Sequence, residues 1–288
     1  MSDFAVAPLP ARFARLVKIE HTVFALPFAY VGAFLAVHGT PPAHDLLWIT
    51  LAMVGARSLA MALNRLIDAG LDARNPRTAG RELPSGQLSV LQVAFFCAGS
   101  LALFLASVWE LAPLTHLLWP IPVVGFVVYP YLKRWTWLCH FWLGAVDGLA
   151  PVGAWVAITN KLPWQSWALG AAVMFWVAGF DLFYALFDLE VDREQGLHSF
   201  ATRFGVRGTF IGARLAHVAT VAFLVVAGAG LPVGGLYWIG VAVVAGLLFY
   251  EHTLVRPGDL RRLDAAFFTM NGVISVAFAA FVIADAIL

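Results

Sequence analysis

The chain has 288 residues, of which 61% are hydrophobic and only 12% are charged. Soluble domains carry roughly 25% charged residues, so this composition excludes an ordinary soluble protein and indicates a polytopic helical membrane protein. The formal net charge of +1 gives no support for a nucleic-acid partner.

Nine apolar segments follow one another along the chain, each near the roughly 20 residues that a helix needs to cross the hydrocarbon. We predict an all-α membrane protein, with nine transmembrane helices in one domain that spans 1–288. The first segment is expected to be a retained helix and not a cleaved signal peptide. The predicted spans are 17–38, 46–68, 89–109, 113–132, 137–159, 165–188, 209–229, 234–252 and 265–286.

Lysine and arginine gather in alternate loops, and this pattern predicts the orientation in the membrane. Cations precede the first span and follow the second, fourth, sixth and eighth, where they are Arg256, Arg261 and Arg262. The opposite loops contain only Lys161. Because cytoplasmic loops carry the excess of such residues, we expect a cytoplasmic N-terminus in the inner membrane of a bacterium. Nine spans then place the C-terminus outside.

The second predicted span ends in a row of polar side chains. Asn64, Asp68 and Asp72 follow one another at four-residue intervals, and each interval advances about 40° around an α-helix. They therefore form one slowly turning ridge, with Asn64 deepest in the membrane. Two carboxylates at the edge of an apolar medium are costly unless a partner offsets them, and a hard divalent cation is a common partner.

A similar row closes the sixth span. Asp188 and Asp192 repeat the four-residue spacing, and Asp181 lies two turns before Asp188 on nearly the same face. The motifs at 64–72 and 188–192 look like a pseudo-repeat, because the same offset separates both pairs of aspartates. If the rows face each other, four carboxylates and a carboxamide surround one cavity. This all-oxygen set suits Mg²⁺ that is completed by substrate phosphates.

Cationic side chains are expected around this cavity, where they suit the non-bridging oxygens of a diphosphate. They are Arg74, Arg77, Arg81, Lys133, Arg134 and Arg193. Carboxylates, a divalent metal and cations at a membrane face predict a site that ionises a lipid diphosphate. The simpler alternatives are that an Asp pair caps a helix end and that loop arginines only set the topology. The matched positions of the two rows favour a site.

Two charged residues lie deeper in predicted spans. Arg57 is two turns before Asn64 on the same face, where a charge costs about 2.5–3.5 kcal/mol on insertion scales and normally marks function. It either pairs with Asp181 or binds an anionic acceptor, and the sequence leaves both open. Asp147, inside the fifth span, has no role that the sequence assigns.

Three motifs in register resemble those of the UbiA superfamily of intramembrane prenyltransferases. They are Asn64-x-x-x-Asp68-x-x-x-Asp72, Tyr129-x-x-x-Lys133 and Asp188-x-x-x-Asp192. Other stretches, among them Thr136-Trp-Leu-Cys-His140, are similar to the 4-hydroxybenzoate polyprenyltransferase-like branch, which includes enzymes of the futalosine route to menaquinone. Arg65 stands where many relatives have a further Asp, a departure that keeps the four-residue spacing.

The resemblance implies a UbiA-type helical bundle with a cytoplasmic-side active-site cavity and cap loops. It implies Mg²⁺-dependent transfer of a polyprenyl group from polyprenyl diphosphate to a ring carbon of a small hydroxylated aromatic carboxylate. The acceptors on this pattern are 4-hydroxybenzoate or 1,4-dihydroxy-6-naphthoate, in ubiquinone or menaquinone biosynthesis. Besides these two substrates and the lipid bilayer, no partner is inferred, and no protein partner in particular.

The resemblance also assigns roles to residues. Arg57 is expected at the acceptor carboxylate, and Tyr129 and Asp181 along the acceptor and the prenyl cation. The metal ligands on the family's pattern are Asn64, Asp68, Asp72, Asp188 and Asp192, the four aspartates being catalytic together with Lys133. The diphosphate contacts are Arg74, Arg81, Lys133, Arg134 and Arg193.

Rival functions remain open at this point. A UbiA-type enzyme with another acceptor, haem or a chlorophyll precursor, has the same motifs. A secondary transporter also uses buried charge and internal repeats, but it predicts carboxylates near the midplane. An intramembrane aspartyl protease needs two aspartates close together in mid-membrane, for which Asp147 and Asp181 are the candidates. The sequence sets neither the prenyl chain length, the number of Mg²⁺ ions nor the oligomeric state.

Overall fold

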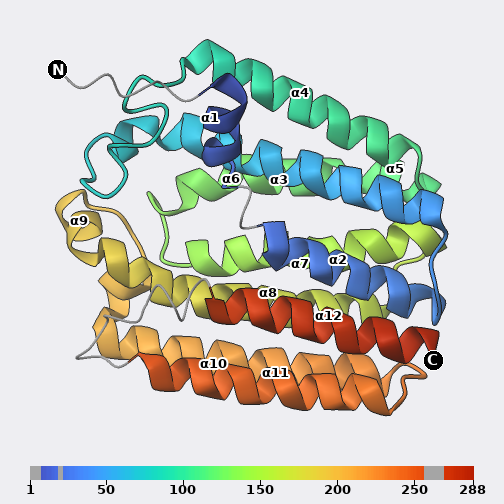
Figure 1. Cartoon of the computed structure of the whole chain (residues 1–288). Coiled ribbons are helices and arrows are strands. Elements are labelled where there is room, and N and C mark those ends of the chain that lie inside the picture. The colour runs from blue at the N-terminus through green and yellow to red at the C-terminus, as the bar shows by residue number, and fades with distance from the viewer. Residues whose placement is uncertain (1–7, 19–21, 256–268) are drawn as a thin grey trace.

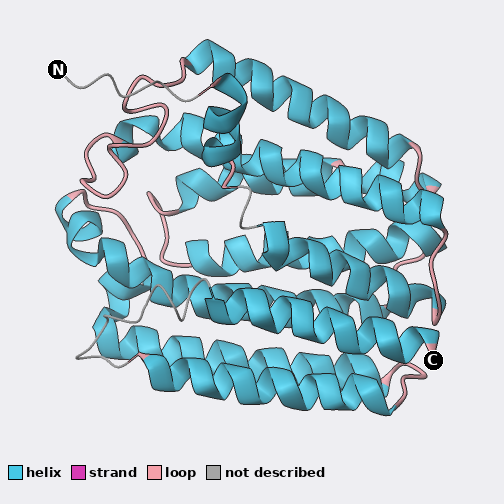
Figure 2. Cartoon of the chain, viewed as in Figure 1, coloured by secondary structure: helices cyan, strands magenta, loops and turns pink. Residues whose placement is uncertain are grey.

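The computed structural model of the chain describes residues 8–18, 22–255 and 269–288. These ranges contain helices joined by loops and no strand (Figure 2). The long helices are α2 (Thr22–Val37), α3 (Ala43–Asp72), α4 (Val90–Trp109), α6 (Pro120–Leu132), α7 (Cys139–Thr159), α8 (Trp164–Tyr184), α10 (Phe200–Ala229), α11 (Gly235–Leu254) and α12 (Asn271–Ile287). The short elements are α1 (Leu9–Leu16), α5 (Pro113–Leu118), the 3₁₀ turn η2 (Ala185–Asp188) and α9 (Leu189–Glu194).

Seven helical stretches in the described ranges are long and apolar enough to cross a membrane. They are Ala43–Asp72, Val90–Trp109, Pro113–Leu132, Cys139–Thr159, Trp164–Glu194, Phe200–Ala229 and Gly235–Leu254. Helices α2 and α12 are apolar but shorter. The first and last predicted spans include residues 19–21 and 265–268, which lie outside the described ranges, as do Arg256, Arg261 and Arg262. Nine spans therefore stay a prediction.

Several element boundaries differ from the sequence-based expectation, and α3 extends from Ala43 to Asp72 where 46–68 was predicted. Three further differences change the course of the chain. The predicted span 113–132 is divided at Trp119, because Pro120 has no N–H and suits the first turn of a new helix. The predicted span 165–188 continues through η2 into α9. The helix expected at 209–229 begins at Phe200 and bends at Gly205, whose φ of 67° lies in the left-handed region that glycine tolerates best.

The helices fall into two regions (Figure 1). We call α3, α4, α5, α6 and α7 the cavity region, and α8, α10, α11 and α12 the packed region. Helix α3 packs against α4 and α6, α7 packs against α8, and α8 packs against α10. Helix α2 lies between the two regions, in contact with both α7 and α12.

The largest hydrophobic cluster joins α2 to the packed region. Trp176 of α8 is 1% exposed, and its ring lies 4.9 Å from that of Phe28 in α2. Phe278 of α12 is fully buried beside the buried Tyr237, whose hydroxyl donates to the Leu224 carbonyl oxygen at 2.7 Å. Aromatic rings of this size contribute most of the buried area in such a core.

Helices α7 and α8 approach each other through glycine. A Cβ atom on Gly144 would lie 2.1 Å from the backbone oxygen of Met174, and one on Gly148 would lie 2.5 Å from the oxygen of Gly170. Small residues four apart on one face let membrane helices come into backbone contact. This contact fixes the position of α7, and therefore of the side chains that α7 directs toward α8.

Candidate active site

A cavity of about 590 Å³ lies between α3, α4, α6, α7 and one face of α8. Helix α3 lines it from Ile49 to Asp72, a length of about 35 Å at 1.5 Å per residue. Charged side chains gather at the end near Asp72, the last residue of α3. Apolar side chains such as Met53 and Leu118 line the rest. The cavity fits an elongated apolar molecule with a charged end.

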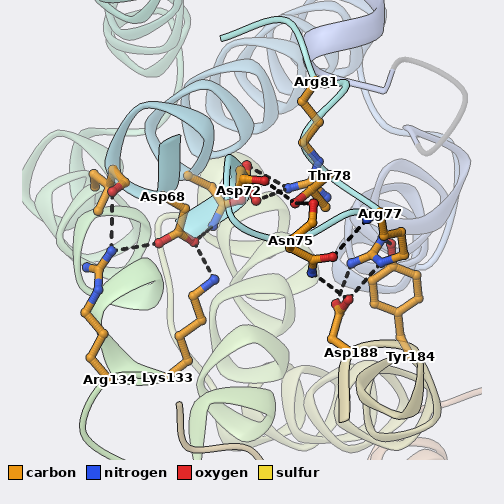
Figure 3. Close-up of polar contacts among 12 residues, drawn as sticks. Asp68, Asp72, Asn75, Arg77, Thr78, Arg81, Lys133, Arg134, Tyr184 and Asp188 are labelled. Carbon is orange, nitrogen blue, oxygen red and sulfur yellow. Dashed lines mark hydrogen bonds and ion pairs between the residues drawn. The ribbon is translucent and has the colours of Figure 1, made fainter. Parts of the chain in front are cut away.

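The row at the end of α3 forms as the spacing predicts, and it faces the cavity. Asp68 is 2% exposed and pairs with Lys133 Nζ at 2.9 Å and Arg134 Nη2 at 3.0 Å (Figure 3). Asn64 Nδ2 donates to the same carboxylate at 3.2 Å. Two cations therefore neutralise this carboxylate and an amide donates a hydrogen bond to it, which offsets the cost of its burial.

The loop after α3 folds back over Asp72. Arg81 Nη1 donates to both carboxylate oxygens of Asp72, at 2.7 and 2.8 Å (Figure 3). The Thr78 hydroxyl donates to the Asp72 carbonyl oxygen at 3.0 Å, which satisfies a free carbonyl at the end of the helix. The loop is thus held by the row that it covers.

The same loop also reaches the second row. Asn75 Nδ2 and Arg77 Nε donate to Asp188 Oδ1 at 2.9 and 2.8 Å (Figure 3). Arg77 Nη2 donates to the other oxygen of the same carboxylate, Oδ2. Arg77 Nη1 donates to the Tyr184 hydroxyl at 2.7 Å. Burial lowers the pKa of Arg77, but its hydrogen bonds to Asp188 and Tyr184 outweigh burial and raise the pKa above its ordinary value. The guanidinium therefore stays charged throughout the physiological pH range.

The four predicted metal-binding aspartates, Asp68, Asp72, Asp188 and Asp192, line this one cavity. Within the described ranges, no three acidic, histidine or cysteine side chains converge closely enough to hold a metal ion by themselves. Mg²⁺ needs no such cage, because it is typically bound by one or two carboxylates and completed by waters and substrate phosphates. The all-oxygen donors and the nearby cations therefore fit a Mg²⁺–diphosphate complex.

The deeper residues predicted for the acceptor, Arg57, Tyr129 and Asp181, also line the cavity, and so does Asp147. Within the described ranges, the hydrogen-bond partner of Asp181 is His140 at 2.7 Å, and not the Arg57 that the sequence offered as one alternative. Arg57 interacts electrostatically with Asp147 of α7. Asp147, without a role at first, thus faces the deep cation of the cavity.

The predicted diphosphate-binding cations differ in where they lie. Arg81 and Lys133 line the cavity, and Arg134 reaches its wall through Asp68. Arg74 and Arg193 are exposed and are not among the lining residues. Arg74 lies just after α3, and its Nε donates to the carbonyl oxygen of Gly70 in the last turn of that helix. Their contact with a diphosphate stays a prediction.

Several lining residues were not singled out from the sequence. Tyr184 lies four residues before Asp188, so helical spacing could have indicated it. Arg65 is 6% exposed and lines the cavity next to the first row, although the sequence drew attention to it only as a departure from a motif. Asn75 lies in a loop without periodicity, and no sequence signal marks it.

The chain matches the model of the UbiA prenyltransferase family over residues 25–273. The chain belongs to this family. Similar proteins named 4-hydroxybenzoate octaprenyltransferase come from Aliivibrio fischeri, 32% identical over 87% of this chain and 88% of that protein, and from Cupriavidus necator, 31% identical over 96% and 97%. The chain is therefore a prenyltransferase, and its apolar helices fit a multi-pass membrane protein.

Solved structures agree with this assignment. A UbiA homologue from Aeropyrum pernix K1 superposes with a TM-score of 0.85 at 32% identity, covering 93% of this chain and 98% of that one. A UbiA homologue from Archaeoglobus fulgidus bound to GPP and Mg²⁺ has a TM-score of 0.74 at 18% identity, covering 95% and 99%. The second likeness establishes the fold alone.

Proposed function

We propose that this enzyme transfers a polyprenyl group from polyprenyl diphosphate to a ring carbon of a hydroxylated aromatic carboxylate. The acceptors are 4-hydroxybenzoate or 1,4-dihydroxy-6-naphthoate, in ubiquinone or menaquinone biosynthesis. The observation that carries the proposal is the cavity itself: two rows of carboxylates and cations at one end, with Arg57 deep in its wall. The names of the similar proteins support the benzoate.

The charged end of the cavity binds the diphosphate. Arg77, Arg81 and Lys133 carry the donors for its non-bridging oxygens, and Arg134 holds Asp68 in place. Bound Mg²⁺ supplies charge neutralisation for the leaving diphosphate. The residues that would hold it are Asn64, Asp68, Asp72, Asp188 and Asp192. Arg74 and Arg193 would act from the rim, where a bound diphosphate could draw them in.

The apolar length of the cavity holds the prenyl chain. Tyr129 lies one turn below Lys133 on α6 and lines the cavity, so its ring face suits the positive charge that develops on the allylic carbon. Apolar walls keep water from that carbon, because water would otherwise attack the allylic cation and convert it to an alcohol. The tail extends along α3 toward Met53 and Leu118.

The acceptor carboxylate binds Arg57. Arg57 precedes Asp68 by eleven residues on α3, which places it about 16 Å deeper along the helix axis. Its planar guanidinium suits a carboxylate, and it lies within the electrostatic influence of Asp147 on α7. An acceptor held there presents its ring toward the charged end.

The active site faces the cytoplasm of a bacterium. The cation-rich loop after α3 and the Lys133–Arg134 pair lie at the charged end of the cavity, which the distribution of cations assigns to the cytoplasmic side. With nine spans of the inner membrane, the N-terminus is cytoplasmic and the C-terminus outside.

Transfer of labelled polyprenyl diphosphate in membranes, with Mg²⁺ or with a chelator, tests this proposal. Each carboxylate acceptor is compared with the corresponding phenol, in wild type, in Arg57→Ala and in Arg203→Ala, whose arginine is exposed outside the cavity. Loss of a charged hydrogen bond worth about 1.5–3 kcal/mol predicts that Arg57→Ala raises the acceptor KM roughly 10- to 100-fold.

The KM of the corresponding phenol should be the same in Arg57→Ala as in wild type, because the phenol has no carboxylate. Arg203→Ala should behave as wild type with both acceptors. An unchanged acceptor KM in Arg57→Ala removes Arg57 from the acceptor site. Wild-type membranes that prenylate neither carboxylate acceptor in the presence of Mg²⁺ refute the proposed substrate class.

A further inference from the structure

A histidine–aspartate pair lies in the cavity wall, apart from the carboxylate rows. His140, the second residue of α7, is 6% exposed, and its Nδ1 lies 2.7 Å from Asp181 Oδ2 in α8. Both residues line the cavity. The glycine contact between the two helices makes this reach possible, because Gly144 is one turn after His140 and touches the α8 backbone at Met174.

The hydrogen bonds of His140 fix which nitrogen carries the ring proton. The backbone N–H of Phe200 donates to His140 Nε2 at 3.3 Å, so the lone pair of Nε2 is occupied. The proton is therefore on Nδ1, which donates to Asp181 Oδ2. His140 has no nitrogen left to accept a proton from a substrate. It acts on Asp181 by holding one of its two oxygens.

Asp181 keeps its other oxygen for the cavity. In the described part of the chain, no hydrogen bond engages Oδ1, and the side chain is 13% exposed. Asp181 precedes Asp188 by seven residues, three in α8 and four in η2, and so lies about 12 Å deeper than the second carboxylate row. Arg57 lies about 16 Å deeper than Asp68. The Asp181 carboxylate thus sits between the level of the diphosphate and that of the acceptor carboxylate.

The geometry points to Asp181 as the base that removes the ring proton of the acceptor, with His140 as its positioning residue; this inference rests on the proposed function. The C1–O bond of the prenyl diphosphate breaks first, and its electron pair leaves with the diphosphate. The ring carbon then forms a bond to C1 with a pair of ring π electrons. The same ring carbon then gives its hydrogen as a proton to Asp181 Oδ1. The C–H electron pair returns to the ring and restores aromaticity.

An isotope effect tests the assignment. The acceptor carries deuterium on the ring carbons ortho to the hydroxyl, and transfer is measured in wild type, Asp181→Asn, His140→Leu and His140→Gln. When breakage of the C1–O bond limits the wild-type rate, its isotope effect is near unity. Asp181→Asn should lower kcat by about 10²- to 10⁴-fold, the usual contribution of a general base, and raise the isotope effect well above unity. His140→Leu should do the same more weakly, and His140→Gln, which keeps an N–H donor, should recover part of the loss.

A second readout separates this inference from the proposed function. Oxygen-18 is placed in the ester position, between C1 and the first phosphorus of the prenyl diphosphate. It moves to non-bridging positions of that phosphate when the C1–O bond breaks and re-forms. Asp181→Asn should keep this exchange, because ionisation precedes proton loss. Glu190→Gln, whose carboxylate is exposed in α9 and does not line the cavity, should match wild type in both assays.

Two outcomes overturn the assignment while leaving the proposed transferase intact. In the first, Asp181→Asn has the same kcat as wild type. In the second, Asp181→Asn has a lower kcat, but its isotope effect stays at unity. If Asp181→Asn does not fold, the same isotope criterion applies to His140→Leu. A wild-type enzyme that shows neither exchange nor transfer contradicts the proposed function itself.

Discussion

Buried polar groups occur in both regions of the molecule, but they are arranged differently. In the cavity region and in the η2 turn that follows α8, Asp68 and Asp188 each contact a cation and line a cavity. In the packed region, Glu251 and Asn271 are fully buried, and His217 pairs with His252 at 3.0 Å, yet none of these four lines the cavity. Burial of a polar or titratable side chain is therefore not by itself a sign that the residue lies at the cavity. A buried charge that has an opposite partner and access to a cavity is a better signal of function.

The largest effect that this comparison predicts is on catalysis, at the second row. Asp188→Asn should lower prenyl transfer by at least about 100-fold, because charge neutralisation of a leaving diphosphate is worth several kcal/mol. Its thermal midpoint should hardly change, since a partly exposed ion pair contributes about 1 kcal/mol or less. Transfer and thermal melting in detergent are measured beside Glu190→Gln, whose exposed side chain lies outside the cavity lining. Equal losses of transfer in Asp188→Asn and Glu190→Gln would contradict the distinction between carboxylates that line the cavity and carboxylates that do not.

The boundary between the regions should show an intermediate effect, on stability first. Gly144→Ala places a methyl group 2.1 Å from the Met174 oxygen, so α7 and α8 must separate. Overpacking of this kind costs about 1–3 kcal/mol. Gly246→Ala in α11 is the matched control, because nothing lies within 4 Å of its Cβ position. A lowered melting temperature in Gly144→Ala alone is expected. Equal melting temperatures would mean that the contact is not close.

The smallest predicted effect lies in the packed region, at the end of the bundle that is remote from the carboxylate rows. Asp285 of α12 accepts the backbone N–H groups of Gly234, Leu236 and Tyr237 at 2.7, 3.0 and 3.2 Å, and so caps the N-terminus of α11. Asp285→Ala should cost about 0.5–2 kcal/mol of stability, as loss of a helix cap does. Transfer by the folded variant should stay at the wild-type rate. A changed acceptor KM would show that this end is coupled to the cavity.

Helical spacing was enough to predict the parts of the site that one helix presents by itself. The rows at Asn64–Asp72 and Asp188–Asp192 were predicted because residues four apart share a face, and the apolar segments predicted the membrane helices. Family resemblance added the Tyr129–Lys133 motif. Both rows do line one cavity.

Spacing could not predict what depends on contacts between distant segments. Asn75 and Arg77 reach Asp188 from more than 100 residues away in the chain, because the loop after α3 folds across the cavity end. His140 reaches Asp181 because glycine brings two helices together. Such pairs are decided by the path of a loop or by helix packing, which no local pattern encodes.

The central claim is that the two carboxylate rows act as one site. Prenyl transfer by Asp68→Asn, Asp188→Asn and the double variant, at saturating Mg²⁺, tests it most directly. Residues that act as a unit are strongly non-additive, so the double variant should be only slightly slower than the slower single variant. Losses that multiply in the double variant, or single variants that retain wild-type transfer, would contradict the claim.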